Sequence, residues 1–153
     1  MVDRISNHLV GIAGVHHVVS ELSRRGLVAL PTVRSIAAYD VLVATLDGKR
    51  HANLQVKASL KRVGFFPMPP ADKVRAGPHD WYVLLRWLPR EGRFEGFILP
   101  GRQAREEVVR EQKRQAKRIK AHGRGKFFPA LHVGPKAEGR EKLWLKRWLT
   151  WAL

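Results

Sequence analysis

Residues 39–57 of this 153-residue chain read YDVLVATLDGKRHANLQVK, which is the pattern of a β-hairpin. Residues 39–46 are apolar and rich in β-branched side chains, and residues 50–57 alternate between apolar and polar types, as strands do. Between them, Asp47-Gly48 is a strong turn signal. The segment therefore predicts two antiparallel strands joined by a tight turn.

The length of the turn determines which residues of the two strands face each other. A loop of two or four residues centred on Asp47-Gly48 pairs Asp40 with Gln55, whereas a three-residue loop would break this pairing. The same register pairs apolar residues on the opposite face: Val41 with Leu54, and Val43 with Ala52. A slip by one residue would mix the two faces, so the wholly apolar face supports this register.

Asp40, Gln55 and Lys57 are therefore expected on one polar face, within side-chain reach of one another. A carboxylate and an amide carbonyl are oxygen ligands that suit Mg²⁺. A neighbouring lysine can orient a water molecule and stabilise charge on a phosphate. A metal ion that bridges the phosphate and the water molecule is usual in phosphodiester hydrolysis. These three are the candidate catalytic residues, with Asp40 and Gln55 as metal ligands. Taken singly, each would be an ordinary residue of a half-exposed strand.

The rest of the chain predicts a single mixed α/β domain over residues 1–153, with its core at about 6–100. The hydrophobic pattern predicts these further elements: a helix over 6–25, an edge strand or connection over 27–30, a long loop over 64–78, strands over 81–88 and 93–99, a basic helix over about 103–122, and a tryptophan-rich helix over about 140–153. A thin apolar stripe is expected on the basic helix: Ala104, Val108, Gln112 or Ala116, and Ile119.

The chain is strongly basic, with 29 Lys and Arg against 13 Asp and Glu, a formal net charge of +16. Such an excess attracts polyanions, so nucleic acid is the expected partner, in preference to a membrane. The charge does not distinguish DNA from RNA, and DNA is the expected one of the two. The basic helix and the loop after it supply the candidate nucleic-acid-binding residues: Arg110, Lys113, Arg114, Lys117, Arg118, Lys120, Arg124 and Lys126.

The order of these elements resembles that of the PD-(D/E)XK nuclease superfamily, whose fold is restriction-endonuclease-like. Three segments carry the resemblance: Gly14 to Gly26, Tyr39-Asp40-Val41-Leu42-Val43, and Leu54-Gln55-Val56-Lys57. They lie within roughly the first sixty residues, and the later elements suit that fold without being diagnostic. The resemblance implies a Mg²⁺-dependent endonuclease in which Asp40 is a metal ligand, Gln55 replaces the family's second acid, and Lys57 is the catalytic lysine.

The first helix departs from the family pattern. Many members carry a glutamate just after a glycine there, whereas here Gly14 is followed by Val15, His16 and His17. Glu21, one turn beyond His17, and His17 itself are the candidate accessory residues. With one carboxylate and one neutral amide, the predicted site has about half the usual negative charge, so weak binding of Mg²⁺ is expected.

Two other functions stay open from the sequence. One is a nucleic-acid-binding module on the same fold without catalysis, and the other is a basic subunit of a larger nucleoprotein assembly with its interface around the tryptophan helix. Core packing or a homodimer contact is favoured over base stacking for Trp144, Trp148 and Trp151. Phe127 and Phe128 lie between basic residues and could contact bases, but core positions are expected for them.

Other classes of site find no support in the sequence. The chain has no cysteine, and its seven histidines lack a zinc spacing. No phosphate loop, nucleophile elbow or dinucleotide fingerprint occurs. We expect a cytoplasmic location, because no apolar run approaches the length of a membrane span and the first residues lack the apolar core of a secretory signal.

Overall fold

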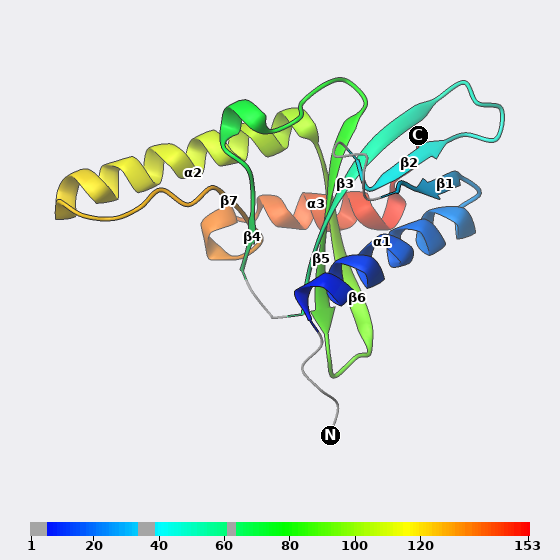
Figure 1. Cartoon of the computed structure of the whole chain (residues 1–153), viewed down its shortest axis with the longest axis horizontal. Helices are drawn as coiled ribbons and strands as arrows, with labels where there is room; N and C mark the ends of the chain where they lie inside the picture. The colour runs from blue at the N-terminus through cyan, green and yellow to red at the C-terminus, as the bar shows by residue number, and fades with distance from the viewer. Residues whose placement is uncertain (1–5, 34–38, 61–63) are drawn as a thin grey trace.

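The hairpin lies within the main sheet of the protein, as seen in the computed structural model, which describes residues 6–33, 39–60 and 64–153 (Figure 1). Twelve described elements follow in chain order: α1 (Asn7–Arg24), β1 (Val28–Pro31), β2 (Val41–Ala44), β3 (His51–Ser59), β4 (Phe65–Pro67), the 3₁₀ helix η1 (Ala71–Lys73), β5 (Asp80–Leu88), β6 (Arg93–Pro100), α2 (Gly101–His122), β7 (Ala130–His132), the 3₁₀ helix η2 (Pro135–Ala137) and α3 (Arg140–Thr150). The order of strands in the main sheet is β1-β2-β3-β5-β6, and β4 pairs with β7 separately. β3 and β5 run parallel and the other neighbours antiparallel, so the expected α/β domain with a mixed sheet flanked by helices is confirmed.

The register of the hairpin is the predicted one. Val41 pairs with Leu54 and Val43 with Ala52, and all four side chains are buried. The loop has four residues between Thr45 and Arg50, whose backbone hydrogen bond closes it at 3.0 Å. The first strand is shorter than the predicted 39–46, because β2 begins after Asp40 and ends before this loop.

One face of the sheet is covered by α1. The Ser6 hydroxyl accepts from the Leu9 amide at 3.3 Å and caps the helix, which buries Val18 and Leu22 against the strands. A Cβ atom at Gly14 would lie 2.6 Å from the Ala58 Cβ, so the missing side chain lets the helix approach β3 closely. Residues of α1 and of all five strands of the main sheet thus contribute to the first hydrophobic core.

The other face is covered by α2 and the small β4–β7 sheet, and α3 packs along the edge strand β6. Trp144 belongs to the core under α2, whereas Trp148 and Trp151 belong to the core under α1. All three tryptophans are at most 5% exposed, so core packing is confirmed for them and their rings are not free to form a partner interface.

The buried face of α2 differs from the predicted stripe. Ala104 and Val108 are buried as expected, but Gln112 and Ala116 are exposed. Three polar side chains are buried instead: Glu107, Glu111 and Gln115. Hydrophobic spacing alone did not reveal this face, because its partners come from the distant segments around β7 and α3.

One further expectation concerns the exposure of two phenylalanine residues, and another concerns helices that could span a membrane. The predicted core positions of Phe127 and Phe128 are wrong, because the two residues are 37% and 50% exposed. They lie in the segment that returns from the end of α2, where little of the chain is available to cover them. No helix among the described residues is long and apolar enough to cross a membrane.

Candidate functional site

The sequence-predicted site lies beside a pocket at the edge of β3. β2 pairs only with residues 51–54 of β3, so the following part of β3 has no strand neighbour on that side. α1, the end of β1 and the entry to β2 enclose a pocket of about 380 Å³ there. Its described lining is Gly11, Ile12, Val15, His16, Pro31, Thr32, Tyr39, Asp40, Gln55 and Val56. Two of the three predicted catalytic residues, Asp40 and Gln55, therefore line one pocket.

Asp40 takes the place of the missing strand neighbour. Its backbone amide donates to the Leu54 carbonyl at 2.9 Å, which continues the pairing by one residue. Its carboxylate Oδ2 then accepts from the Val56 amide at 2.7 Å and from Gln55 Nε2 at 2.6 Å. The carboxylate thus satisfies a strand amide that would otherwise lack a partner, which is a structural role in itself.

Gln55 and Lys57 lie on the same face of β3, two residues apart, and both are half-buried. The hydrogen bond to Asp40 uses the nitrogen of the Gln55 amide and leaves its oxygen, Oε1, as the atom available to a cation. Lys57 lies outside the described pocket lining, two residues beyond Gln55 along β3. The structure therefore brings Asp40 and Gln55 into contact and places Lys57 next to them.

The accessory residues proposed from the sequence lie elsewhere. Glu21 pairs with Arg24 at 3.2 Å and with Arg25 at 3.4 Å near the end of α1. His17 packs on Phe94 with ring centroids 5.2 Å apart, and burial, opposed by Glu21, lowers its pKa. Neither belongs to the described pocket lining.

The helix presents His16 to the pocket instead, a residue that the sequence reasoning did not select. Consecutive residues of a helix point about 100° apart, and here that step turns His17 out of the pocket and towards Phe94. The signal was available in the sequence, because Gly11, Ile12, Val15 and His16 form one helical face beside the buried stripe.

A second unselected residue, Arg75, lies at the edge of this site. Its guanidinium stands over the Tyr39 ring at 4.8 Å, and Nη1 donates to the Tyr39 hydroxyl at 2.9 Å. Its backbone amide donates to the Tyr82 hydroxyl at 3.1 Å, which anchors the loop to β5. Tyr39 precedes Asp40, so a fixed positive charge stands beside the pocket. No periodic pattern marks Arg75 in the sequence, because it lies in an irregular loop.

The donors of the pocket suit a weakly held Mg²⁺. Among the described residues, no group of three or more His, Cys, Asp or Glu side chains could hold a metal ion. Mg²⁺, however, is often bound by one or two carboxylates while waters and substrate phosphates complete its octahedron. Asp40 and the Gln55 carbonyl match that smaller set, and the expected weakness of binding follows from the single charge.

The predicted nucleic-acid-binding residues lie on an extension that we call the basic arm, residues 110–126. In Figure 1 the end of α2 projects beyond the sheet, and the following segment runs back beside it. The arm carries eight Lys and Arg against one acid, Glu111. All eight predicted residues are exposed on it: Arg110, Lys113, Arg114, Lys117, Arg118, Lys120, Arg124 and Lys126.

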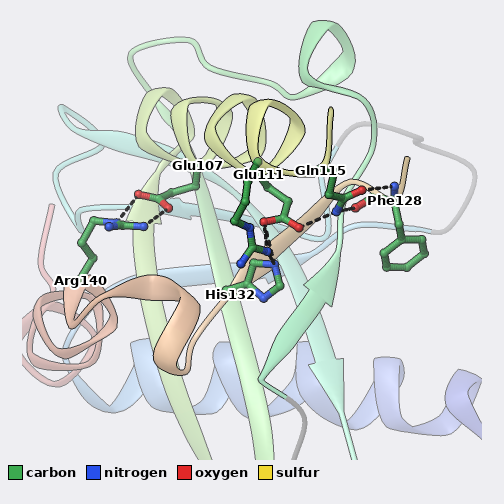
Figure 2. A network of polar contacts seen from close by, with 7 residues as sticks. Glu107, Glu111, Gln115, Phe128, His132 and Arg140 are labelled. Atoms are coloured by element: carbon green, nitrogen blue, oxygen red, sulfur yellow. Dashed lines mark hydrogen bonds and ion pairs between the residues drawn. The ribbon is translucent and has the colours of Figure 1, made fainter. Parts of the chain in front are cut away.

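The root of the arm is held by the buried polar residues of α2 (Figure 2). Arg140 donates to both Glu107 oxygens, at 2.6 and 2.9 Å. Glu111 forms an ion pair with Arg114 and lies 3.2 Å from His132 Nε2.

Burial raises the pKa of Glu111, but the hydrogen bond from Gln115, the charge of His132 and the hydrogen bond from Arg114 together lower it below the ordinary value. Burial lowers the pKa of His132, and this outweighs the opposing effect of Glu111. The carboxylate is therefore charged and the imidazole neutral near pH 7.

One solved structure that resembles part of this chain is that of a bacterial homing endonuclease, I-Ssp6803I. The TM-score is 0.44 and the sequence identity 15%, over 63% of this chain and 67% of that chain. No protein-family model matches the sequence, and no curated protein does so either.

Proposed function

We propose that this chain binds DNA through its basic arm and cleaves phosphodiester bonds at the pocket, with Mg²⁺ held by Asp40 and Gln55. The observation that carries the proposal is the contact between Asp40 and Gln55 in the wall of an open pocket, with Lys57 on the same strand face. This agrees with the resemblance to the PD-(D/E)XK superfamily, which implies a restriction-endonuclease-like fold and these roles.

The chemistry follows from the residues present. A bound Mg²⁺ would supply a Lewis acid for the phosphate and lower the pKa of a bound water. Asp40 would provide the negative charge of the site and the Gln55 carbonyl a neutral ligand. Lys57 and Arg75 would stabilise the charge on the phosphate. Because one carboxylate holds Mg²⁺ weakly, the ion is expected to bind together with the DNA phosphate.

Cleavage is tested with supercoiled and linear DNA in the presence of Mg²⁺ or Mn²⁺. We expect divalent-dependent cleavage that Asp40→Asn and Lys57→Ala abolish, because the first removes the charge of the site and the second the cation beside it. The matched controls are Asp72→Asn and Lys142→Ala, which change exposed residues of the same types. The enzyme hypothesis fails if the wild-type chain cuts no duplex, branched or single-stranded DNA.

Binding is tested separately, because the pocket lies against α1 and the arm extends from α2 on the other face of the sheet. We expect the logarithm of the affinity to fall linearly with the logarithm of salt concentration. Lys117→Glu and Arg118→Glu should weaken binding to all sequences and flatten this slope, by about one unit for each phosphate that the variant no longer binds. Lys142→Glu is the control. Equal losses of affinity for all three variants would contradict a binding role specific to the arm.

The alternative function is a DNA-binding module without catalysis. One specific observation favours it: the carboxylate Oδ2 of the only acid in the described pocket lining already serves two hydrogen bonds to the strand. Salt-dependent binding that survives Asp40→Asn, together with no cleavage by the wild-type chain, would support this module. DNA rather than RNA as ligand, and the homodimer, stay predictions; competition with RNA and light scattering measure them.

A further inference from the structure

Two phenylalanine rings stand exposed together at the root of the basic arm. Phe65 on β4 is 40% exposed and Phe128 is 50% exposed. Their ring centroids lie 5.9 Å apart at an angle of 88°, an edge-to-face arrangement. We call them the phenylalanine pair. A single exposed apolar residue is common, but two in contact on a strongly charged surface form a patch.

The backbone of Phe128 is held in place by a buried side chain. The Gln115 amide donates to the Phe128 carbonyl at 2.8 Å and accepts from the Phe128 amide at 2.8 Å, as Figure 2 shows. Gln115 is 7% exposed and also donates to Glu111 at 2.5 Å.

Phe65 is held from the other side, because it pairs with His132 across β4 and β7, and His132 contacts Glu111. A buried polar network thus ends in two exposed rings. Rings whose backbone is already ordered lose less entropy on binding.

The surroundings of the pair are cationic. Arg124 and Lys126 precede Phe128 in the returning segment and are exposed. Arg114 lies beside His132 at 3.3 Å, and it is paired with Glu111, the only acid of the arm. Exposed aromatic rings within a basic surface match a ligand that has flat faces and repeated negative charges. Single-stranded nucleic acid has both, because bases stack on aromatic side chains while the backbone follows the positive charges.

Duplex DNA does not offer the same contact. Its base faces are covered by the neighbouring base pairs, so only phosphates and groove edges meet a protein surface. We infer that Phe65 and Phe128 stack on unpaired bases of single-stranded DNA whose phosphates are bound by the basic arm. The inference rests on the proposed DNA binding and adds the class of substrate: DNA with an unpaired or displaced strand.

The experiment compares the affinities of the wild-type chain for an oligothymidylate and for a duplex of equal length, measured by fluorescence anisotropy. Phe128→Leu keeps an apolar side chain and removes the ring, and we expect it to weaken binding of the single strand by about fivefold or more. Duplex affinity should stay unchanged, and Phe128→Trp should retain the affinity for the single strand. Leu149→Ala, another exposed apolar residue at 65% exposure, is the matched control and should change neither affinity.

Phe65→Leu is an independent second variant, because Phe65 belongs to β4 and lies outside the segment that Gln115 holds. Single-strand affinity unchanged in both leucine variants would overturn the inference, and so would an equal loss for single strand and duplex. Tighter binding of a single-stranded RNA of matched sequence would overturn the assignment to DNA. A chain that binds no DNA refutes the proposed function as well, whereas salt-dependent duplex binding without any effect of the rings refutes this inference alone.

Discussion

Replacing Asp40 is expected to affect stability and cleavage by different amounts, depending on the substitute. Asp40→Ala removes the acceptor of two hydrogen bonds, from the Val56 amide at 2.7 Å and from Gln55 Nε2 at 2.6 Å. Val56 is buried, so its amide loses its partner at a cost of about 1–3 kcal/mol. Gln55 is half-exposed, so its side-chain amide can form a hydrogen bond with water instead, and the loss of its bond to Asp40 adds little to this cost. At about 2–4 °C per kcal/mol for a chain of this size, the melting temperature should fall by about 2–12 °C.

Asp40→Asn separates the two roles. Its side-chain oxygen can still accept from the Val56 amide, although a neutral acceptor forms a weaker hydrogen bond than a carboxylate. The loss of stability should therefore be below about 1 kcal/mol, while the negative charge required for Mg²⁺ is gone. Thermal unfolding followed by circular dichroism measures the first effect, and cleavage of plasmid DNA measures the second.

Two results would refute this reasoning. If Asp40→Ala unfolds at the wild-type temperature, the carboxylate does not stabilise the edge of β3 as its hydrogen bonds indicate. If Asp40→Asn destabilises the chain as much as Asp40→Ala, the charge and not the acceptor position is what matters. Mg²⁺ that raises the melting temperature of the wild-type chain but not of Asp40→Asn would support Asp40 as a ligand, because a ligand of the folded state stabilises it.

Two predictions concern the fold. Gly14→Ala should destabilise the chain by about 1–3 kcal/mol in urea unfolding, because the new Cβ would lie 2.6 Å from that of Ala58. Gly11→Ala, one turn earlier and with nothing within 4 Å of its new Cβ, should instead stabilise the chain by about 0.5–1 kcal/mol. Equal effects of the two substitutions would contradict the close approach of α1 to β3. Burial lowers the pKa values of His17 and His132 below the ordinary 6.5, so near pH 6 the unfolded chain binds more protons than the folded one. The free energy of unfolding should thus be highest above about pH 6.5 and fall as the pH decreases from there through the lowered pKa values of the two histidines. A melting temperature that rises as the pH is lowered below about 6.5 would contradict this prediction.

The hairpin shows how far local patterns reach. Alternation of period two and the turn at Asp47-Gly48 were enough to place Asp40 beside Gln55, because both signals lie within nineteen consecutive residues. The same reasoning selected His17 and Glu21 on α1, and both lie outside the described pocket lining. A helix turns each residue by about 100°, so choosing the pocket-facing residue requires the rotation of the helix on the sheet. Close packing at Gly14 sets that rotation and brings His16 to the pocket.

The arm shows the opposite case. Its charge is readable from composition, and the eight exposed Lys and Arg are those that the sequence indicated. Its buried side could not be read, because Glu107 and Gln115 look like solvent-facing residues until Arg140 and Phe128 approach from later in the chain. Burial of a polar residue depends on distant partners that satisfy it, and no local period encodes them.

By itself, then, the sequence determined the hairpin register, the contact of Asp40 with Gln55 and the basic character of the arm, because each depends on neighbours in the chain or on composition. Only the tertiary structure decided which face of α1 borders the pocket and that Arg75 stands beside it. It alone also decided that Phe65 and Phe128 are exposed together. These features depend on contacts between segments far apart in the chain, which form only when the two cores pack against the sheet.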